Sequence, residues 1–391
     1  MLIPEILFWI GLAILLYCYI GYGLLLFLIN QVRRIFRRRN ELMEDNLPSV
    51  SLIVSAFNEA GIIEEKIRNC MEIDYPAENL DIIFITDGST DGTDEIIRRH
   101  SQFTVLHNPQ REGKTAAITR AMKSVKTPIV VFSDANSMLN SECIRKIVRH
   151  YDDRRIGGVA GEKKIISEPG SPVGRAEGLY WQYESFMKRQ DAEFHTVVGA
   201  AGELFSIRTE LFNPPGNHVI LDDFVISMSI CIKGFRIGYE PEAFATERPS
   251  ASLAEEEKRK TRIAAGAYQS IGILKSALNF FRYPLLSFQY FSRRLLRWVV
   301  CPAMLPLILI TNAWLWFAME GNHFYMVMLL LQCLFYLAAV IGYLFMRSGR
   351  TAGIISVPFY FLFMNYCLVK GFIRFMRKKQ EVTWEKSKRS E

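Results

Sequence analysis

The chain has 391 residues, of which half are hydrophobic, and its formal net charge is +7. This length allows a sizeable folded core together with membrane-spanning segments. The basic residues gather beside apolar stretches and do not alternate with aromatic residues, which favours contact with anionic lipid and excludes nucleic acid as an expected partner. The seven cysteines have no paired spacing, which argues against a disulfide framework or a zinc site.

The first expected element is a retained membrane anchor within residues 1–31. Residues 4–30 carry a single charge, Glu5, and a membrane span needs roughly 20 apolar residues. The stretch is too long for the apolar region of a signal peptide and lacks a basic lead-in. The arginine-rich run 33–39 that follows marks the cytoplasmic side of a span. A basic stripe that binds nucleic acid is the alternative, but the position at the end of a hydrophobic run favours the membrane.

The block 48–262 is therefore expected in the cytoplasm, and it alternates strands with helices. The pattern predicts strands at 50–56, 81–86, 103–107, 128–133 and near 157–165, and helices at 60–72, 92–100, 114–124 and 141–151. Such alternation indicates an α/β fold with βαβ units and a parallel sheet. Beyond residue 166 we expect a helix at 173–193, a glycine-marked turn into a strand at 199–208, a helix at 222–233 and a short strand at 235–239.

The last part of the chain returns to apolar composition. Residues 263–297 mix apolar, aromatic and basic side chains, which predicts amphipathic helices at the membrane interface. The region 298–373 then contains three apolar stretches, at 298–318, 323–346 and 353–373. Three spans would place the basic tail 374–391 outside, whereas its positive charge predicts a position inside. The stretch 353–373 is the weakest candidate span because it contains Asn365 and Lys370, and the topology stays open.

Three acidic loop sites carry most of the chemical information. Asp87 and Asp134 each follow a short apolar run that is typical of a buried strand, and Asp222 with Asp223 form an adjacent pair. Ligands of open α/β sheets bind beyond the carboxyl ends of the strands. Carboxylates in that position predict a metal-bridged phosphate ligand. The alternative for Asp87 is a helix cap, and for the pair it is an acidic helix start favoured by the helix dipole.

Two common nucleotide motifs are excluded. The run Glu112 to Thr115 looks like the end of a phosphate-binding loop, but that loop requires a glycine where the chain has Asn108. No Gly-x-Gly-x-x-Gly follows a strand. Polar side chains and free backbone groups nevertheless end the first two expected strands, and together they can contact a uracil-like base and its ribose; the residues are Ala56, Asn58, Glu59 and Asp87.

The second and third acidic sites have the residue types of metal and proton chemistry. Asp134 and Asn136 lie two residues apart, so both can face the same side of an extended strand end. Hard cations such as Mg²⁺ or Mn²⁺ prefer such oxygen ligands and keep substrate phosphates in their shell. In the pair Asp222–Asp223, one charge raises the pKa of the neighbouring carboxyl toward that of a useful general base.

The order of these motifs resembles the family 2 glycosyltransferases with the GT-A fold, especially membrane-bound bacterial members that build surface polysaccharide. The resemblance covers roughly residues 48–270 and the flanking spans. It implies a Rossmann-like nucleotide-diphospho-sugar transferase domain flanked by transmembrane helices. By this resemblance Asp87 contacts uracil, Lys114 lies near the diphosphate, Asp134 and Asn136 hold Mg²⁺ or Mn²⁺, and Asp223 is the general base.

Two departures from the family pattern bear on function. Asn136 replaces the second carboxylate of the Asp-x-Asp metal motif, which removes one negative charge. Processive members carry Gln-x-x-Arg-Trp, whereas the run 259–263 here keeps the arginine, Arg262, and has Ile263 in place of the tryptophan. Arg262 can still bind diphosphate, but the lost stacking platform argues against long processive synthesis.

The expected function is an inverting transfer of a sugar from a nucleotide-diphosphate donor, expected to be a UDP-sugar. The acceptor would be lipid-linked or a polysaccharide, at the plasma membrane, with membrane lipids as further partners. One alternative is the transfer of a single sugar to a polyprenyl phosphate. Another is a non-catalytic membrane scaffold with a degenerate transferase domain.

Overall fold

The computed structural model describes residues 2–36, 47–166, 172–319, 322–348, 350 and 353–377. Its strands are β1 Val50–Ala56, β2 Leu80–Asp87, β3 Thr104–Asn108, β4 Ile129–Asp134, β5 Met138–Leu139, β6 Ile156–Ile165, β7 Phe205–Arg208 and β8 Arg236–Glu247. The helices of the same region are α3 Ile63–Met71, α4 Thr93–Arg98, α5 Lys114–Met122, α6 Cys143–Val148, α7 Pro172–Phe194, α8 Asp222–Ile232 and α9 Leu253–Ile273. Outside it lie α1 Leu2–Leu16, η1 Tyr17–Gly21, α2 Tyr22–Phe36, α10 Pro284–Tyr290, η6 Phe291–Val300, α11 Cys301–Ala318, α12 His323–Arg347 and α13 Ser356–Met376.

The eight strands form one sheet in the order β3-β2-β1-β4-β7-β6-β8-β5. The half β3-β2-β1-β4 is parallel, as the alternation of strands and helices predicts. The other half is mixed, because β7 pairs antiparallel with both β4 and β6. Strand β6 therefore runs in the same direction as β4, as expected, but it is separated from β4 by β7, an oppositely directed strand formed 40 residues later in the chain. Only a pairing between distant segments decides this position, and the local pattern does not contain it.

The sheet is covered on both faces, which is why its central strands are continuous apolar runs. Successive side chains of a strand point to opposite faces. Ile53, Ile83 and Val130 accordingly pack in one core with α5 and α8, whereas Leu52 and Phe84 pack in the other with α3 and α6. This double burial fixes the strand ends, and with them the loops that carry Asp87 and Asp134.

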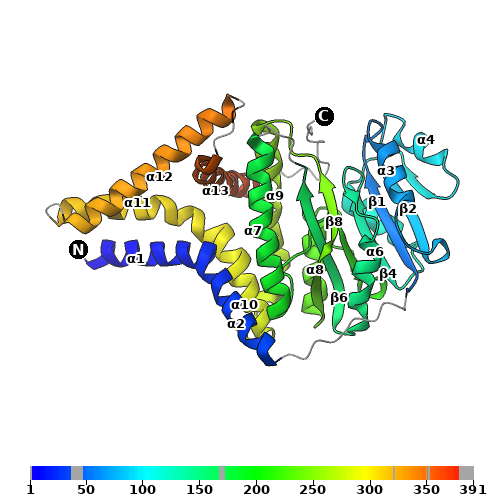
Figure 1. Cartoon of the computed structure of the whole chain (residues 1–391), viewed down its shortest axis with the longest axis horizontal. Coiled ribbons are helices and arrows are strands. Elements are labelled where there is room, and N and C mark those ends of the chain that lie inside the picture. Colours follow the sequence, from blue (N-terminus) through cyan, green and yellow to red (C-terminus); the bar gives the residue numbers. More distant parts are fainter. Residues whose placement is uncertain are drawn as a thin grey trace.

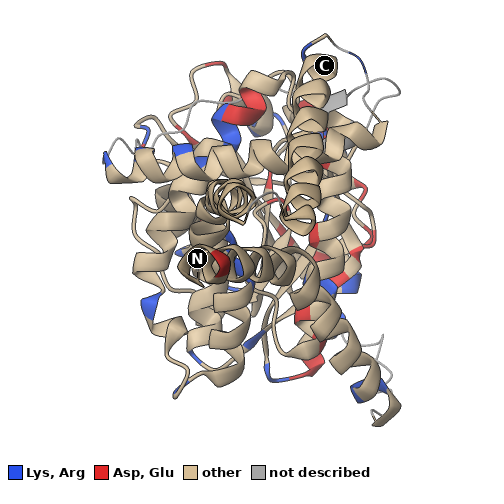
Figure 2. Cartoon of the chain, turned by 90° about the vertical axis from the view of Figure 1, so that its left-hand side faces the viewer, with Lys and Arg blue, Asp and Glu red and all other residues tan. Residues whose placement is uncertain are grey.

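Within the described residues, four helices are long and apolar enough to cross a membrane, namely Leu2–Phe36, Pro284–Ala318, His323–Arg347 and Gly353–Met376. In Figure 1, α1, α11 and α12 extend away from the sheet on one side of the molecule. Apolar side chains on them face outward, including Trp314 and Leu330. Figure 2, viewed from this side, shows few Lys, Arg, Asp or Glu residues on the helices that face the viewer. This part has the surface of a membrane-embedded region.

Helix α13 differs from these three in direction. It is seen almost end-on in Figure 1, where α1, α11 and α12 are seen from the side. It packs closely on α9, since a Cβ built on Gly371 would lie 2.4 Å from Cβ of Ala264. Lys370 of α13 also pairs with Glu257 of α9. Helix α13 therefore runs across the other apolar helices and is fastened to the sheet domain.

The interfacial helices expected at 263–297 are not found in that form. Helix α9 begins ten residues earlier and belongs to the sheet domain, and residues from 284 continue through η6 into α11. Arg293 and Arg297 are buried in ion pairs and do not face lipid headgroups: Arg293 lies 2.7 Å and Arg297 2.6 Å from the carboxylate of Glu184. Asp191 adds a further contact, 3.2 Å from Nε of Arg293. We call these four residues the α7–η6 ion cluster.

An arginine-rich helix looks the same in sequence whether its partners are lipid phosphates or carboxylates a hundred residues away, so the sequence does not reveal these ion pairs; the interfacial position of 263–297 stays a prediction. The anchor expected at 1–31 extends to Phe36, and its second half packs on α7, where the Tyr22 hydroxyl donates to Asp191 at 2.6 Å and Asn30 donates to the Gln190 carbonyl at 3.0 Å. Residues 37–39 of the arginine-rich run and 378–391 of the basic tail lie outside the described residues.

Candidate active site

The loops after β1 and β2 are bonded to each other. The amide oxygen of Asn58 accepts a hydrogen bond from the backbone N–H of Thr90 at 2.9 Å, and the Asn58 N–H donates to Oγ of Ser89 at 3.2 Å. The N–H of Glu59 donates to Oγ1 of Thr93 at 2.9 Å. Asn58 thus binds the neighbouring loop, and Ile62 is the N-cap residue of α3. The backbone of Asn58 is left-handed, with φ 52°. With the buried Ala56, these residues form one edge of the expected nucleotide site.

Asp87, at the end of β2, holds the segment that precedes α5. Its Oδ2 accepts hydrogen bonds from the N–H groups of Glu112 and Gly113 at 2.9 and 2.6 Å. Its Oδ1 lies 3.7 Å from the guanidinium of Arg120. Burial raises the pKa of Asp87, and the two backbone hydrogen bonds and Arg120 oppose that rise. Asp87 therefore positions the start of α5, where Lys114 lies.

Lys114, Asp134 and Asp223 lie close together at the edge of the sheet. The ammonium of Lys114 lies 2.6 Å from Oδ1 of Asp134. A Cβ built on Gly202 would be 3.2 Å from both the Lys114 ammonium and Oδ2 of Asp223. Lys114, Asp134 and Asp223 thus converge beside Gly202, where a larger side chain would crowd the Lys114 ammonium and the Asp223 carboxyl. The structure brings together three residues that are 20 and 89 positions apart in the chain.

The surroundings of this centre shift the pKa values of Asp223 and Lys114. Asp223 has a pKa raised to about 7, first by burial and then by the charge of Asp222. Its Oδ1 accepts from the N–H of Phe224 at 2.7 Å. Burial alone would lower the pKa of Lys114, but Asp134, Asp222 and Asp223 outweigh it and raise that pKa. A carboxyl that titrates near neutral pH is suited to accept a proton.

Arg262 joins the centre from α9. Burial lowers its pKa, and the charges of Asp222 and Asp134 oppose that change, which places the guanidinium within electrostatic range of both carboxylates. The arginine of the incomplete Gln-x-x-Arg-Trp motif is therefore close to the expected diphosphate position. Arg259 and Lys260 of the same run turn away and form ion pairs with Glu256.

The donor set at this centre fits a divalent cation that is shared with a phosphate ligand. Among the described residues no group of three or more His, Cys, Asp or Glu side chains forms a cation cage. Asp134, Asp222 and Asp223 all act on the charge of Lys114, and Asp134 and Asp222 also act on that of Arg262. Oδ2 of Asp222 is buried without a hydrogen-bond partner in the described part of the chain. One carboxylate and the Asn136 amide, completed by phosphate oxygens, match the ligand preference of Mg²⁺ or Mn²⁺.

A buried ion network next to this centre is missing from the sequence-based prediction. Lys163, whose side chain is 1% exposed, pairs with Glu203 and, at 2.6 Å, with Glu247. Glu247 accepts from the Ser137 hydroxyl at 2.9 Å, and the Glu203 carbonyl accepts from the Ser133 hydroxyl at 3.2 Å. The network therefore supports both the Asp134 turn and the 199–208 loop. The one signal in the sequence is that Glu203 is the only acidic residue within 199–208.

The predicted site residues thus fall into two neighbouring groups. The first, at the ends of β1 and β2, contains Ala56, Asn58, Glu59 and Asp87. The second contains Lys114, Asp134, Asp222, Asp223 and Arg262, with Asn136 half-buried beside Asp134. The segment 112–114 links the two, because Asp87 holds its backbone and Lys114 reaches Asp134.

The chain is similar to known glycosyltransferases in sequence and in fold. Residues 51–214 match the family model "Glycosyl transferase family 2". A poly-beta-1,6-N-acetyl-D-glucosamine synthase of Staphylococcus aureus is 23% identical over 252 residues, which cover 61% of this chain and 59% of that protein. A beta-monoglucosyldiacylglycerol synthase of Synechocystis is 23% identical over 235 residues, covering 57% of this chain and 48% of that protein. The matched region thus spans about half to three fifths of these relatives.

A solved structure is similar over nearly the whole chain. The mannosyltransferase PcManGT of Pyrobaculum calidifontis, solved in complex with GDP-Man and Mn²⁺, aligns with a TM-score of 0.71 and 20% identity. The alignment covers 95% of this chain and 99% of that one. The fold is accordingly the GT-A fold with flanking apolar helices.

Proposed function

We propose that this chain, whose residues 51–214 match the family 2 glycosyltransferase model, transfers a sugar from a nucleotide-diphosphate donor to a hydroxyl group of a membrane-associated acceptor, with inversion at the anomeric carbon. UDP is the proposed nucleotide. The observation that carries the proposal is the convergence of Lys114, Asp134 and Asp223 around Gly202. A cation suited to a diphosphate and a carboxyl whose pKa is raised to about 7 both lie close to Gly202, and this pairing supports the proposal.

The proposed step is a single displacement. The acceptor oxygen forms a bond to the anomeric carbon while the bond from that carbon to the diphosphate oxygen breaks. Asp223 takes the proton of the acceptor hydroxyl, and the diphosphate leaves with the electron pair. One displacement at carbon inverts its configuration. Asp222 keeps the pKa of Asp223 raised, which makes that carboxylate a stronger base than an isolated aspartate.

The leaving diphosphate needs positive charge near it. Lys114 and Arg262 supply two cations at this position. A divalent ion held by Asp134 and Asn136 would add charge neutralisation of the leaving group. This divalent ion would share the Asp134 carboxylate with the Lys114 ammonium. On the other side of the segment 112–114, the ends of β1 and β2 with Asn58, Glu59 and Asp87 are the proposed contacts of the base and ribose.

The membrane location of the acceptor is proposed from the helices. Three apolar helices extend from one side of the domain and a fourth packs against α9, so the catalytic centre lies near a bilayer surface. The matched relatives are named for a polysaccharide and for a glycolipid product, and both kinds of acceptor are compatible with that position. We propose that the domain is cytoplasmic, on the side of the plasma membrane where arginine follows the first span.

The direct test is the substitution Asp223→Asn. The amide keeps the size of the side chain and cannot accept the proton, so transfer should fall by about 10²- to 10⁴-fold. Binding of UDP, followed by thermal stabilisation of the detergent-purified protein, should remain. Asp152→Asn, a substitution in the loop that follows α6, is the matched control and should leave both readouts unchanged. Transfer at more than a tenth of the original rate in the Asp223→Asn protein would exclude the assignment of the base.

A further inference from the structure

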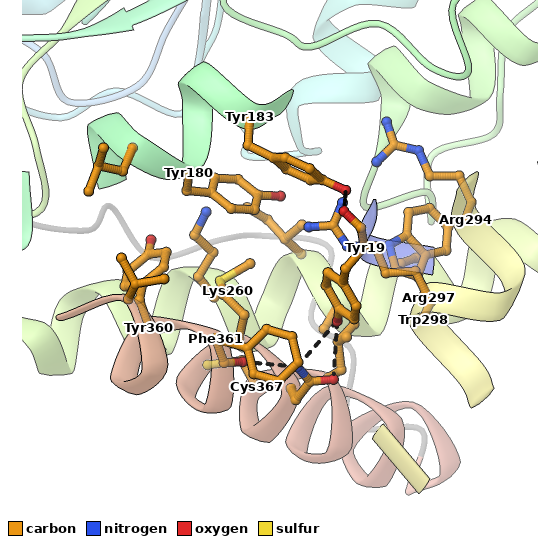
Figure 3. A pocket seen from close by; sticks show the side chains of 18 of the residues that line it. Tyr19, Tyr180, Tyr183, Lys260, Arg294, Arg297, Trp298, Tyr360, Phe361 and Cys367 are labelled. Carbon is orange, nitrogen blue, oxygen red and sulfur yellow. Dashed lines mark hydrogen bonds between the residues drawn. The ribbon is translucent and has the colours of Figure 1, made fainter. Parts of the chain in front are cut away.

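A cavity lies between the domain and the apolar helices, and aromatic and cationic side chains line it. Its volume is about 370 Å³, within the range of small-ligand pockets. The wall comes from η1, α7, α9, η6 and α13, as Figure 3 shows. The aromatic side chains that line it are Tyr19, Tyr180, Tyr183, Trp298, Tyr360 and Phe361.

The charged side chains of this wall have one sign. Lys260, Arg294 and Arg297 line the cavity, and no Asp or Glu is among its described lining residues. Behind them, Glu184 and Asp191 face three guanidinium groups, those of Arg293, Arg294 and Arg297. Two carboxylates against three arginines leave an excess of one positive charge. Lys260 is balanced by Glu256, 3.5 Å away. The cavity is thus complementary to an anion.

The cavity adjoins the catalytic centre on two sides. Trp298 lies with its ring centroid 5.4 Å from that of Phe224, whose N–H donates to Asp223. On α9, Ile263 lines the cavity while the preceding Arg262 belongs to the centre. Ile263 also stands where the processive motif has its tryptophan. Trp298, from an element outside that motif, provides an indole in the same cavity.

Much of the cavity wall belongs to the apolar helices. Tyr19 lies within the first candidate span, Trp298 within the second, and Val357 at the start of the helix that crosses them. Val357 and Leu179 line the cavity and are also 49% and 43% exposed, so they form its rim. An occupant can therefore extend from the cationic wall to the hydrocarbon region of the membrane.

From this arrangement we propose that the cavity binds the phosphate group and the adjoining hydrocarbon segment of a lipid phosphate that carries the acceptor sugar. The inference rests on the proposed function and names the class of its acceptor. The phosphate would lie against Arg294, Arg297 and Lys260, the chain would leave past Val357, and the sugar would extend past Phe224 toward Asp223. The aromatic rings supply apolar contact for the first carbons of the chain and cation–π support for the arginines, with Arg297 5.5 Å from the Tyr19 ring centroid.

The test uses the full chain in nanodiscs of zwitterionic lipid and three probes: farnesyl phosphate, farnesol and inorganic phosphate. Thermal unfolding in the presence of each probe gives an apparent Kd. Farnesyl phosphate should bind at least tenfold more tightly than either of the other two. Equal binding of farnesol would show a merely apolar cavity, and equal binding of phosphate would show a site for a free anion. Either result would overturn the proposal.

Two pairs of matched variants locate the binding. Val357→Trp fills the rim and Val369→Trp places the same bulk on the same helix, at a residue that is 44% exposed and does not line the cavity. Lys260→Met removes a cation of the wall, and Lys370→Met removes a lysine of α13 outside it. The first member of each pair should weaken farnesyl phosphate binding at least tenfold and the second should leave it unchanged. Unchanged binding in Val357→Trp, or displacement of the probe by a free oligosaccharide, would contradict the lipid phosphate.

Two UDP measurements distinguish a failure of the lipid inference from a failure of the proposed function. Thermal stabilisation by UDP and release of UDP from a UDP-sugar are measured on the same preparation. If farnesyl phosphate fails to bind while both UDP readouts are positive, the lipid inference falls and the transferase proposal stands. If both UDP readouts are negative, the transferase proposal falls, whatever the lipid probe shows.

Discussion

At the scale of single residues, the site depends on two carboxyls in sequence that have different surroundings. Asp223 faces Gly202 and titrates near pH 7, whereas the neighbouring Asp222 supplies a negative charge that helps to raise that pKa. Because the base must be ionised to accept a proton, transfer should decline as the pH falls through about 7. The acidic limb of the pH profile is therefore a direct readout of Asp223.

The substitution Asp222→Asn should move this acidic limb to lower pH. Removing the neighbouring negative charge lowers the pKa of Asp223, so the base stays ionised in more acidic solution. A pH profile of kcat/KM for the two proteins measures the shift. The burial of Asp223, the larger cause of its raised pKa, is unchanged, so the limb should not reach the position of an exposed aspartate. A limb that stays in place would show that Asp223 does not control it.

Asn136→Asp should strengthen the binding of Mg²⁺ or Mn²⁺. The change restores a second carboxylate two residues after Asp134, and hard cations bind carboxylates more strongly than amides. The metal concentration for half-maximal transfer should fall, and more EDTA should be needed to stop the reaction. Asn140→Asp, in the same connection but bonded to the Phe244 N–H and the Glu242 carbonyl, is the control and should leave the metal requirement unchanged. A requirement that is equal in all three proteins would place the metal elsewhere.

At the scale of elements, the contact between α7 and η6 joins the domain to the apolar helices. The α7–η6 ion cluster is buried and balanced, with Glu184 between Arg293 and Arg297. Breaking such a pair from one side leaves an uncompensated buried charge. This contact also forms part of the cavity wall, so its stability and the shape of that cavity are linked.

Glu184→Gln should destabilise the protein by about 3–5 kcal/mol, the usual cost of removing one partner of a buried ion pair. Thermal unfolding of the purified protein would show a clearly lower Tm. The comparison is Asp74→Asn, which removes the partner of Arg145 at the surface, where an exposed pair contributes about 1 kcal/mol or less. Equal unfolding temperatures for the two variants would contradict a buried, strongly coupled cluster.

The structure shows which features can be predicted from the sequence and which cannot. Strand β1 is predicted to the residue, and Asp87 and Asp134 are placed correctly at strand ends, because an apolar run followed by a polar loop is a local pattern. Glu203 and Lys163 are missed because their importance depends on a contact between segments 40 residues apart. The ion pairs of the η6 arginines are missed for the same reason, since Glu184 is more than a hundred residues away. The residues at the strand ends can be predicted from local patterns, whereas ion pairs between distant segments cannot.

At the scale of the whole molecule, the direction of α13 bears on the topology left open by charge alone. Three apolar helices extend from the domain, and α13 crosses them while packed on α9. If only those three cross the membrane, the chain starts outside, and the domain and the C-terminus share the cytoplasmic side. The basic residues of the tail then lie where positive charge is normally found.

Reporter fusions test this arrangement. A fluorescent protein at the C-terminus should fold and fluoresce, and alkaline phosphatase at the same position should be inactive, because the tail is expected inside. A phosphatase inserted after Met319, between α11 and α12, should be active. Active phosphatase at the C-terminus would instead require α13 to cross the membrane as a fourth span.

The close contact between Gly371 and Ala264 has a consequence for how the protein responds to its surroundings. A membrane span changes its tilt when the hydrocarbon thickness changes. Helix α13 lies across the apolar helices and packs on α9, which carries both Arg262 and Lys260. We therefore expect the proposed sugar transfer to respond to acyl-chain length, which transfer rates in bilayers of short-chain and long-chain lipid would measure.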